Sequence, residues 1–167
     1  MTRFFGIILF FASISNVFAF QNEPDGFRSI KWGTDISRSS ELVFSRNYST
    51  DFDGIKVYKK RFEDLEIGGA RVDEIEYYAW QDKFYKVRAS TGDLMSSGTI
   101  YQACMDRFGD IAHFEGKSVV WEGTITKIIM TERSQSGNQL SMESIELANK
   151  LRPLVRQKEV ERGLKGF

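Results

Sequence analysis

The single histidine and the single cysteine are the first candidates for catalysis in this chain. His113 stands near two carboxylates, Asp110 and Glu115, which together could perform general acid–base catalysis. Cys104 could act as a nucleophile only if a base such as His113 lay in contact with it. The apolar spacing around Cys104 instead predicts a buried position on a helix, and His113 falls in a predicted connector between a helix and a strand. We therefore assign no catalytic residue.

Two groups of carboxylates, at 63–66 and 73–76, are the second set of candidates. Two facing acids could hydrolyse a glycosidic bond. The alternation of a strand, however, places the acids of the second group on a solvated face opposite basic residues. The segment 51–54 resembles the start of a calcium-binding EF-hand loop, but the twelfth position of such a loop would be Phe62 rather than an acid. We therefore predict no metal site.

Composition argues against several other classes of protein. Lys and Arg number 23 and Asp and Glu number 23, so the chain is not a strongly basic nucleic-acid binder. One cysteine cannot form an internal disulfide, and one cysteine with one histidine is too few for a Cys/His zinc site. The sequence contains no P-loop, dinucleotide-binding or nucleophile-elbow motif, so we predict no cofactor.

A predicted hairpin carries the remaining candidate, which is a binding face. Residues 70–80 and 84–91 are expected to pair around a loop at 81–83, with Trp80 facing Phe84. In this register one face is apolar and the other alternates aromatic and charged side chains. If the second face is exposed, it could bind a peptide, a glycan or a partner protein; if another layer covers it, its aromatic residues belong to the core. The residues of this candidate binding face are Glu76, Tyr78, Trp80, Phe84, Lys86 and Arg88.

The apolar and polar patterns predict a single α+β domain over residues 20–162, followed by a flexible tail at 163–167. The expected sheet is largely antiparallel and consists of two three-stranded meanders, with the helices packed on one face. The strands of the two meanders are expected at 55–62, 70–80 and 84–91, and at 118–122, 124–132 and 139–143. Two adjacent glycines, Gly68 and Gly69, predict a tight turn between the first two strands.

Three helices and one further strand complete the expected fold. The strand covers 26–33, and the helices are expected at 34–46, at 93–108 and from Ser144 onward. Asp93 is a suitable N-cap for the second helix, and Gly109 is a suitable stop for it. Pro153 should kink or end the last helix.

Residues 1–19 have the pattern of an export signal. Arg3 supplies a positive charge, an apolar stretch follows, and Val17 and Ala19 occupy the positions that signal peptidase reads. Cleavage after Ala19 would release a periplasmic or secreted protein, and an uncleaved anchor is the alternative. The apolar stretch is too short for a comfortable membrane span. No cysteine lies near the cleavage position, so we predict that the protein is not a lipoprotein.

Short motifs resemble those of a group of uncharacterised exported bacterial proteins. The segment 26–34, GFRSIKWGT, is similar to the Phe-x-x-Ile-x-Trp-Gly-Thr segment that opens their mature chains. The hairpin at 75–87 resembles their Tyr/Trp-rich hairpin, and 119–123 resembles a later Val-x-Trp-x-Gly strand. This resemblance implies a small periplasmic domain without assigned activity. A looser resemblance is to small outer-membrane assembly lipoproteins, from which this chain departs in lacking the lipidation cysteine.

Together these features predict an exported, non-enzymatic binding domain of the bacterial cell envelope, with another envelope protein as its partner. Two alternatives stay open. The first is a small envelope hydrolase or a hydrolase inhibitor, which would use projecting loops at 46–54 or 134–138. The second is a glycan-binding or small-ligand-binding module.

Overall fold

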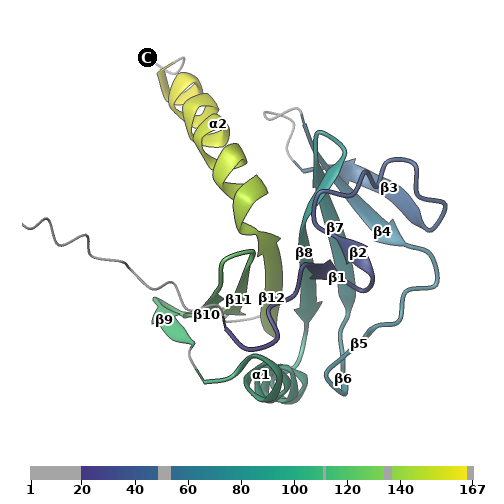
Figure 1. The fold of residues 1–167 in the computed structure, drawn as a ribbon, viewed down its shortest axis with the longest axis vertical. Helices are drawn as coiled ribbons and strands as arrows, with labels where there is room; N and C mark the ends of the chain where they lie inside the picture. Colours follow the sequence, from purple (N-terminus) through teal and green to yellow (C-terminus); the bar gives the residue numbers. More distant parts are fainter. Residues whose placement is uncertain (1–19, 49–53, 111, 134–136, 165–167) are drawn as a thin grey trace, which may run out of the picture.

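An eight-stranded antiparallel sheet forms the centre of the computed structural model, which describes residues 20–48, 54–110, 112–133 and 137–164 (Figure 1). In spatial order the strands are β3 (Leu42–Asn47), β4 (Ile55–Lys60), β7 (Glu74–Trp80), β8 (Lys83–Thr91), β12 (Gly137–Ser144), β11 (Thr126–Arg133), β10 (Ser118–Glu122) and β9 (His113–Glu115). Two helices, α1 (Leu94–Phe108) and α2 (Ile145–Leu164), pack against the sheet. The predicted α+β class and antiparallel sheet are confirmed.

Both predicted meanders form. The first is β4–β7–β8 and the second is β10–β11–β12, and antiparallel pairing of β8 with β12 joins them into one sheet. The turn at Gly68 and Gly69 also forms, with positive φ at both residues. It joins two short strands, β5 (Glu66–Ile67) and β6 (Ala70–Arg71), which form a separate hairpin. The predicted strand 70–80 is therefore divided between β6 and β7.

The predicted strand at 26–33 and the predicted helix at 34–46 are both wrong. Residues 26–31 form a small hairpin of β1 (Gly26–Phe27) and β2 (Ile30–Lys31), because Arg28 and Ser29 both adopt positive φ and reverse the chain. Within the second segment, the Asp35 side chain accepts hydrogen bonds from the backbone N–H and the hydroxyl of Ser37, at 3.1 and 2.7 Å. Such local bonds compete with a helix.

Helix α1 begins and ends where the sequence indicates. The Asp93 side chain accepts a hydrogen bond from the backbone N–H of Ser96 at 2.7 Å, and Gly109 follows the last turn with φ +85°. Cys104 lies on the buried side of α1, as predicted, whereas Leu94 is 74% exposed. The periodic apolar stripe therefore reaches the core only from the second turn onward.

Helix α2 continues through Pro153 to Leu164, so the proline does not end it and the predicted tail begins inside the helix. Pro153 is exposed, and the backbone carbonyl that it leaves unpaired one turn earlier can therefore meet water. Figure 1 shows α2 rising from the end of β12 and projecting away from the sheet. No helix among the described residues combines the length and apolar character that a membrane crossing requires.

The helices lie on opposite faces of the sheet, so the expectation that both pack on one face is wrong. Ile100 of α1 belongs to the large apolar cluster that contains Tyr77 and Phe84, which we call the α1 face. Leu151 of α2 belongs to a small cluster with Tyr78, which we call the α2 face. Tyr77 and Tyr78 are neighbours in β7 and point in opposite directions, so each face carries aromatic side chains that need a cover.

The segment 20–25, before the β1–β2 hairpin, is held against the end of α1 and the turn between β10 and β11. The Phe20 ring packs edge-on against Phe108, with 5.5 Å between the ring centroids. The Glu23 carboxylate accepts hydrogen bonds from the backbone N–H groups of Ile125 and Thr126, at 2.5 and 2.7 Å. Gly123 makes room for it, because a Cβ there would lie 2.1 Å from Glu23 Oε1. Residues 1–19, which carry the predicted export signal, lie outside the described residues.

Candidate functional site

The β7–β8 hairpin has the predicted register over most of its length and departs from it near the turn. The confirmed pairs are Ile75 with Ala89, Glu76 with Arg88, Tyr77 with Val87 and Tyr78 with Lys86. Beyond them a β-bulge shifts the register, so that Trp80 pairs with Lys83 and not with Phe84. The turn is shorter than predicted because Gln81 and Asp82 both adopt positive φ, which makes a two-residue loop.

Because of the bulge, the six candidate residues do not all lie on one face of the hairpin. Phe84 is fully buried on the α1 face, whereas its neighbour Tyr85 joins Tyr78 on the α2 face. Trp80 is half-buried at the edge of that same cluster. Tyr78 and Glu76 are each only 2% exposed, so this face of the hairpin is covered rather than open as a broad surface.

Glu76 is the centre of a buried ion cluster on the α2 face. Its carboxylate accepts hydrogen bonds from the Arg46 guanidinium at 2.6 Å, from the Tyr78 hydroxyl at 2.8 Å and from Arg88. Burial alone would raise the pKa of Glu76, but the hydrogen bonds of Tyr78 and Arg88 and the charges of both arginines outweigh burial and lower it. Glu76 is therefore held as a carboxylate between two arginines.

Glu143 of β12 forms a second ion cluster beside the first. It stands directly opposite Lys86 in the β8–β12 ladder and accepts a hydrogen bond from the Lys86 ammonium at 3.4 Å. Its other oxygen accepts from Arg152 of α2, which thus connects the helix to the sheet. As with Glu76, one buried carboxylate holds two cations.

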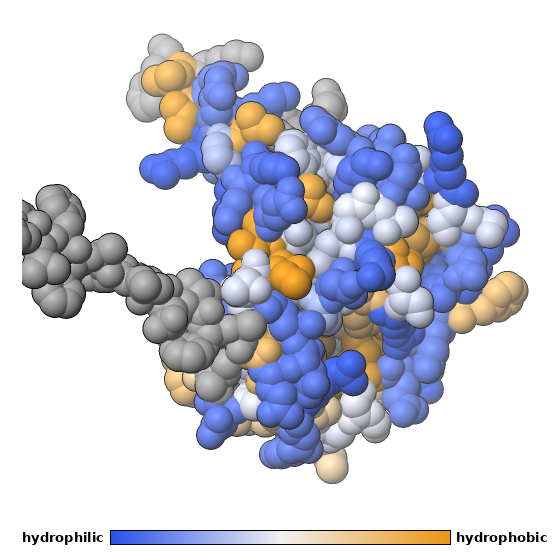
Figure 2. All heavy atoms as spheres, viewed as in Figure 1, coloured by the Kyte–Doolittle hydropathy of each residue, from blue (hydrophilic) through white to orange (hydrophobic). Residues whose placement is uncertain are grey.

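A groove with a volume of about 700 Å³ lies between α2 and the sheet, above these two clusters. Its floor includes the rings of Tyr78 and Tyr85, and α2 supplies an apolar wall of Leu151 and Val155. The exposed ring of Tyr48 lies at the edge of the groove and contacts Tyr78 edge-on, with 5.7 Å between centroids. Figure 2 shows hydrophobic residues among hydrophilic ones near the base of α2.

The groove and the cluster behind it carry an excess of positive charge. The cations are Arg46, Lys86, Arg88, Arg152 and Arg156, and the carboxylates are Glu76, Glu143 and Glu159. Their net charge is therefore +2. Within the part of the chain that the structure describes, the Arg156 side chain makes no hydrogen bond or ion pair. Cations in a partly desolvated groove with aromatic walls are suited to binding an anion.

Three of the six candidate residues, Tyr78, Lys86 and Arg88, line this groove. Sequence reasoning missed Arg46, Glu143 and Arg152, which complete the two ion clusters. Arg46 was missed because it was assigned to a predicted helix at 34–46 rather than to a strand. Glu143 and Arg152 join the site only because β12 pairs with β8. Alternation along 139–143 carried a signal, since it places Glu143 on the face opposite Met142.

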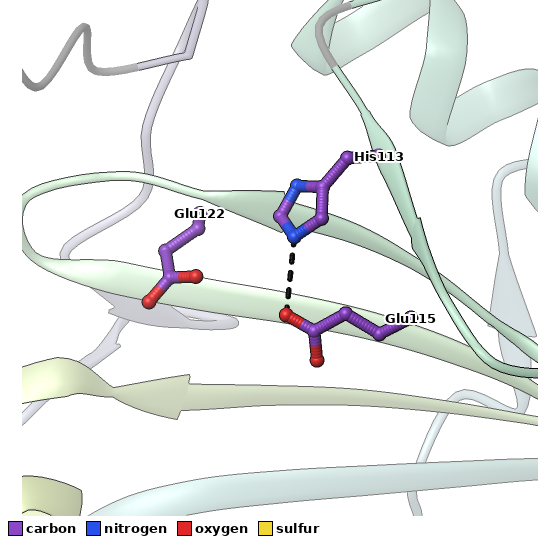
Figure 3. Close-up of side chains that lie close together, drawn as sticks. All are labelled: His113, Glu115 and Glu122. Atoms are coloured by element: carbon purple, nitrogen blue, oxygen red, sulfur yellow. Dashed lines mark hydrogen bonds and ion pairs between the residues drawn. The ribbon is translucent and has the colours of Figure 1, made fainter.

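His113, Glu115 and Glu122 form a different cluster, near the β9 edge of the sheet (Figure 3). His113 lies in β9 rather than in a connector, is exposed, and has Nε2 3.1 Å from Glu115 Oε1. The Lys127 ammonium already occupies the space between the acids, at 3.2 Å from Glu115 and 3.3 Å from Glu122. A metal ion here would have to displace this lysine, so we assign the cluster to surface ion pairing.

Cys104 and His113 do not meet, because the first lies in the α1 face and the second on the exposed strand β9. Burial raises the pKa of the Cys104 thiol to about 11, so the nucleophilic thiolate is scarce at neutral pH. Cys104 borders an apolar hollow of about 610 Å³ between α1 and the β5–β6 hairpin.

Several sequence predictions fall partly outside the described residues. These are the export signal at 1–19, the loop at 46–54 in its part 49–53, the loop at 134–138 in its part 134–136, and the tail at 163–167 in its part 165–167. The predicted calcium-like segment 51–54 is affected in the same way. Comparison of this chain with protein-family models, with curated proteins and with solved structures finds no match.

Proposed function

We propose that this chain is an exported, non-enzymatic binding domain of the bacterial cell envelope, and that it holds its protein partner in the groove between α2 and the sheet. The observation that carries the proposal is the pair of buried carboxylates, Glu76 and Glu143, each of which holds two cations. Glu143 and both of its cations line one groove, and Arg88 reaches the same groove from the Glu76 cluster behind it. The export signal pattern and the resemblance of 26–34 to exported bacterial proteins support the location.

The chemistry of the groove suits recognition better than bond cleavage. Its described lining offers cations, tyrosine rings and aliphatic side chains, whereas the imidazole and the thiol lie elsewhere. Glu76 and Glu143 are both engaged by cations, and folding holds Glu76 ionised, which makes it a poor proton donor near neutral pH.

The partner site can be tested by photo-crosslinking in the producing cell. We would replace Tyr48, whose exposed ring lies at the edge of the groove, with a benzophenone amino acid. Phe114 provides the matched control, because it is also an exposed aromatic residue but lies in β9, on the opposite edge of the sheet. We expect one dominant protein adduct from position 48 and none from position 114. Equal adducts from both positions, or none from 48, would contradict the proposal.

The location has its own test. We expect amino-terminal sequencing of the protein recovered from cells to begin at Phe20 in the periplasmic or secreted fraction. A chain that keeps residues 1–19 and stays with the membrane would support the uncleaved-anchor alternative.

A further inference from the structure

We propose that the groove recognises a carboxylate that sits beside an apolar side chain in a peptide segment of the partner. This inference rests on the proposed function, because it names the chemistry that the same groove would select. Three features carry it: the surplus of cations, the recessed position of Lys86 and Arg88, and the apolar wall next to them.

The cations are shared between buried carboxylates in a way that leaves positive charge available. Arg46 and Arg88 are both held by Glu76, and Lys86 and Arg152 are both held by Glu143. One carboxylate can neutralise only one of its two cations. An incoming carboxylate would therefore complete each cluster rather than compete with it, and a guanidinium can bind it through two parallel hydrogen bonds.

The position of these cations favours a peptide over a lipid bilayer. The side chains of Lys86 and Arg88 are only 27% and 23% exposed, and they lie between the sheet and α2. A flat, anionic bilayer surface would meet cations that project outward, whereas a side chain or a chain end can enter a groove. The chain as a whole also has no net charge that would draw it to such a surface.

The apolar part of the ligand has a matching surface beside the charges. Leu151 and Val155 line the α2 side of the groove, and Tyr85 and Ile55 line the sheet side. On the same helix, Arg152 directly follows Leu151 and Arg156 directly follows Val155, so each arginine lies about 1.5 Å further along the helix axis than an apolar neighbour. A segment with a carboxylate next to a leucine or phenylalanine would bury its apolar group while its charge meets the arginines.

The test uses short peptides of one composition that differ only in the carboxylate. N-acetyl-Phe-Gln-Leu with a free terminal carboxylate, N-acetyl-Phe-Glu-Leu-amide and N-acetyl-Phe-Gln-Leu-amide would be titrated into the full protein, with binding followed by NMR chemical shifts. We expect each carboxylate peptide to bind about tenfold more tightly than the glutamine peptide, and high salt to reduce the difference. The first two peptides show whether a chain end or a side chain is preferred.

Two variants of α2 test whether the carboxylate peptides bind in the groove. Arg156→Gln removes an exposed groove cation that has no partner among the described residues, and Lys150→Gln makes the same charge change on the same helix outside the groove. We expect the first to weaken binding of the carboxylate peptides about threefold and the second to leave it unchanged. Melting temperatures of both variants would show that the fold is intact.

Three results would overturn the inference. The first is that neither carboxylate peptide binds more tightly than the glutamine amide, and the second is equal loss of binding in both variants. The third is binding of dodecanoate where no peptide binds, which would assign the groove to an acyl chain. None of these results touches the crosslink at position 48, so a specific adduct there would keep the proposed partner site while its carboxylate chemistry is rejected.

Discussion

Tyr77 and Tyr78 are neighbours in β7, yet their hydroxyls donate to carboxylates on opposite faces of the sheet. On the α1 face, the Tyr77 hydroxyl donates to Glu63 at 2.7 Å, and Glu63 is paired with Arg28. On the α2 face, the Tyr78 hydroxyl donates to Glu76 at 2.8 Å. Burial raises the pKa of both hydroxyls, so both stay protonated and act as donors.

The two clusters differ in what surrounds the carboxylate. Glu63 is paired with one arginine, Arg28. Arg28 also donates hydrogen bonds to the backbone carbonyls of Asp64 and Glu66, so its other N–H groups hold the loop that leads into β5. Glu76 has two arginines, and one of them, Arg88, lines a groove. The same combination of tyrosine, carboxylate and arginine is therefore fully engaged within the protein on the α1 face. On the α2 face it leaves a surplus positive charge next to the groove.

The largest difference between the faces should appear when apolar side chains are removed. Phe84→Ala empties a fully buried site in the large cluster, and we expect it to lower the free energy of unfolding by about 4 kcal/mol. Leu151→Ala affects the small cluster under α2, where we expect about 2 kcal/mol. Urea unfolding would measure both. Equal losses would show that the α2 face is as much a core as the α1 face.

Replacing the central carboxylate of the α2 face should have the next largest effect. Glu76→Gln leaves Arg46 and Arg88 without their counter-charge, and we expect a loss of about 3 kcal/mol at pH 7. Folding lowers the pKa of Glu76 below its usual value of 4.5, so its contribution is present above that value and is lost as the pH falls through the lower, folded value.

The pH dependence provides the control for this variant. Urea unfolding between pH 7 and pH 3 should show the gap between wild type and Glu76→Gln closing toward the acid end. A gap that stays constant over this range would mean that the cost comes from packing and not from the charge.

The smallest effects should come from the hydroxyls themselves. Among the described residues, Glu63 receives one hydrogen bond from Arg28 and one from Tyr77. Tyr77→Phe removes the second of these, and we expect it to lower the free energy of unfolding by about 2 kcal/mol. Tyr78→Phe leaves Glu76 with two arginines, and we expect about 1 kcal/mol. Thermal unfolding of the two variants would show which hydroxyl contributes more to stability. A larger loss for Tyr78→Phe would reverse the comparison.

Local patterns in the sequence were sufficient for most elements from β4 onward, but not for the segment 26–46 and not for the site. Alternation predicted the pairing of Tyr77 with Val87, and capping residues predicted α1, because both depend on nearby residues. The bulge beside Tyr85 was missed, since the two positive-φ residues of the turn, Gln81 and Asp82, are not glycines.

The groove was harder to predict because two distant pairings create it. Lys86 meets Glu143 only through the ladder between β8 and β12, 57 residues apart in the chain. No local pattern shows that the first turns of α2 then pack against the face opposite α1. Sequence reasoning could therefore identify half of the groove, on β7 and β8, without the helix that completes it.

The fastening of Phe20 and Glu23 also has a consequence for the order of folding. A ribosome releases the chain in the direction from amino to carboxyl terminus, so this segment emerges before the residues that it contacts. Its partners are among the later ones: Glu23 bonds to backbone groups more than 100 positions further on, and Phe20 packs against Phe108. Contacts of such sequence separation slow folding, because the loop must close before they form. We expect the first residues of the domain to be among the last to reach their native positions.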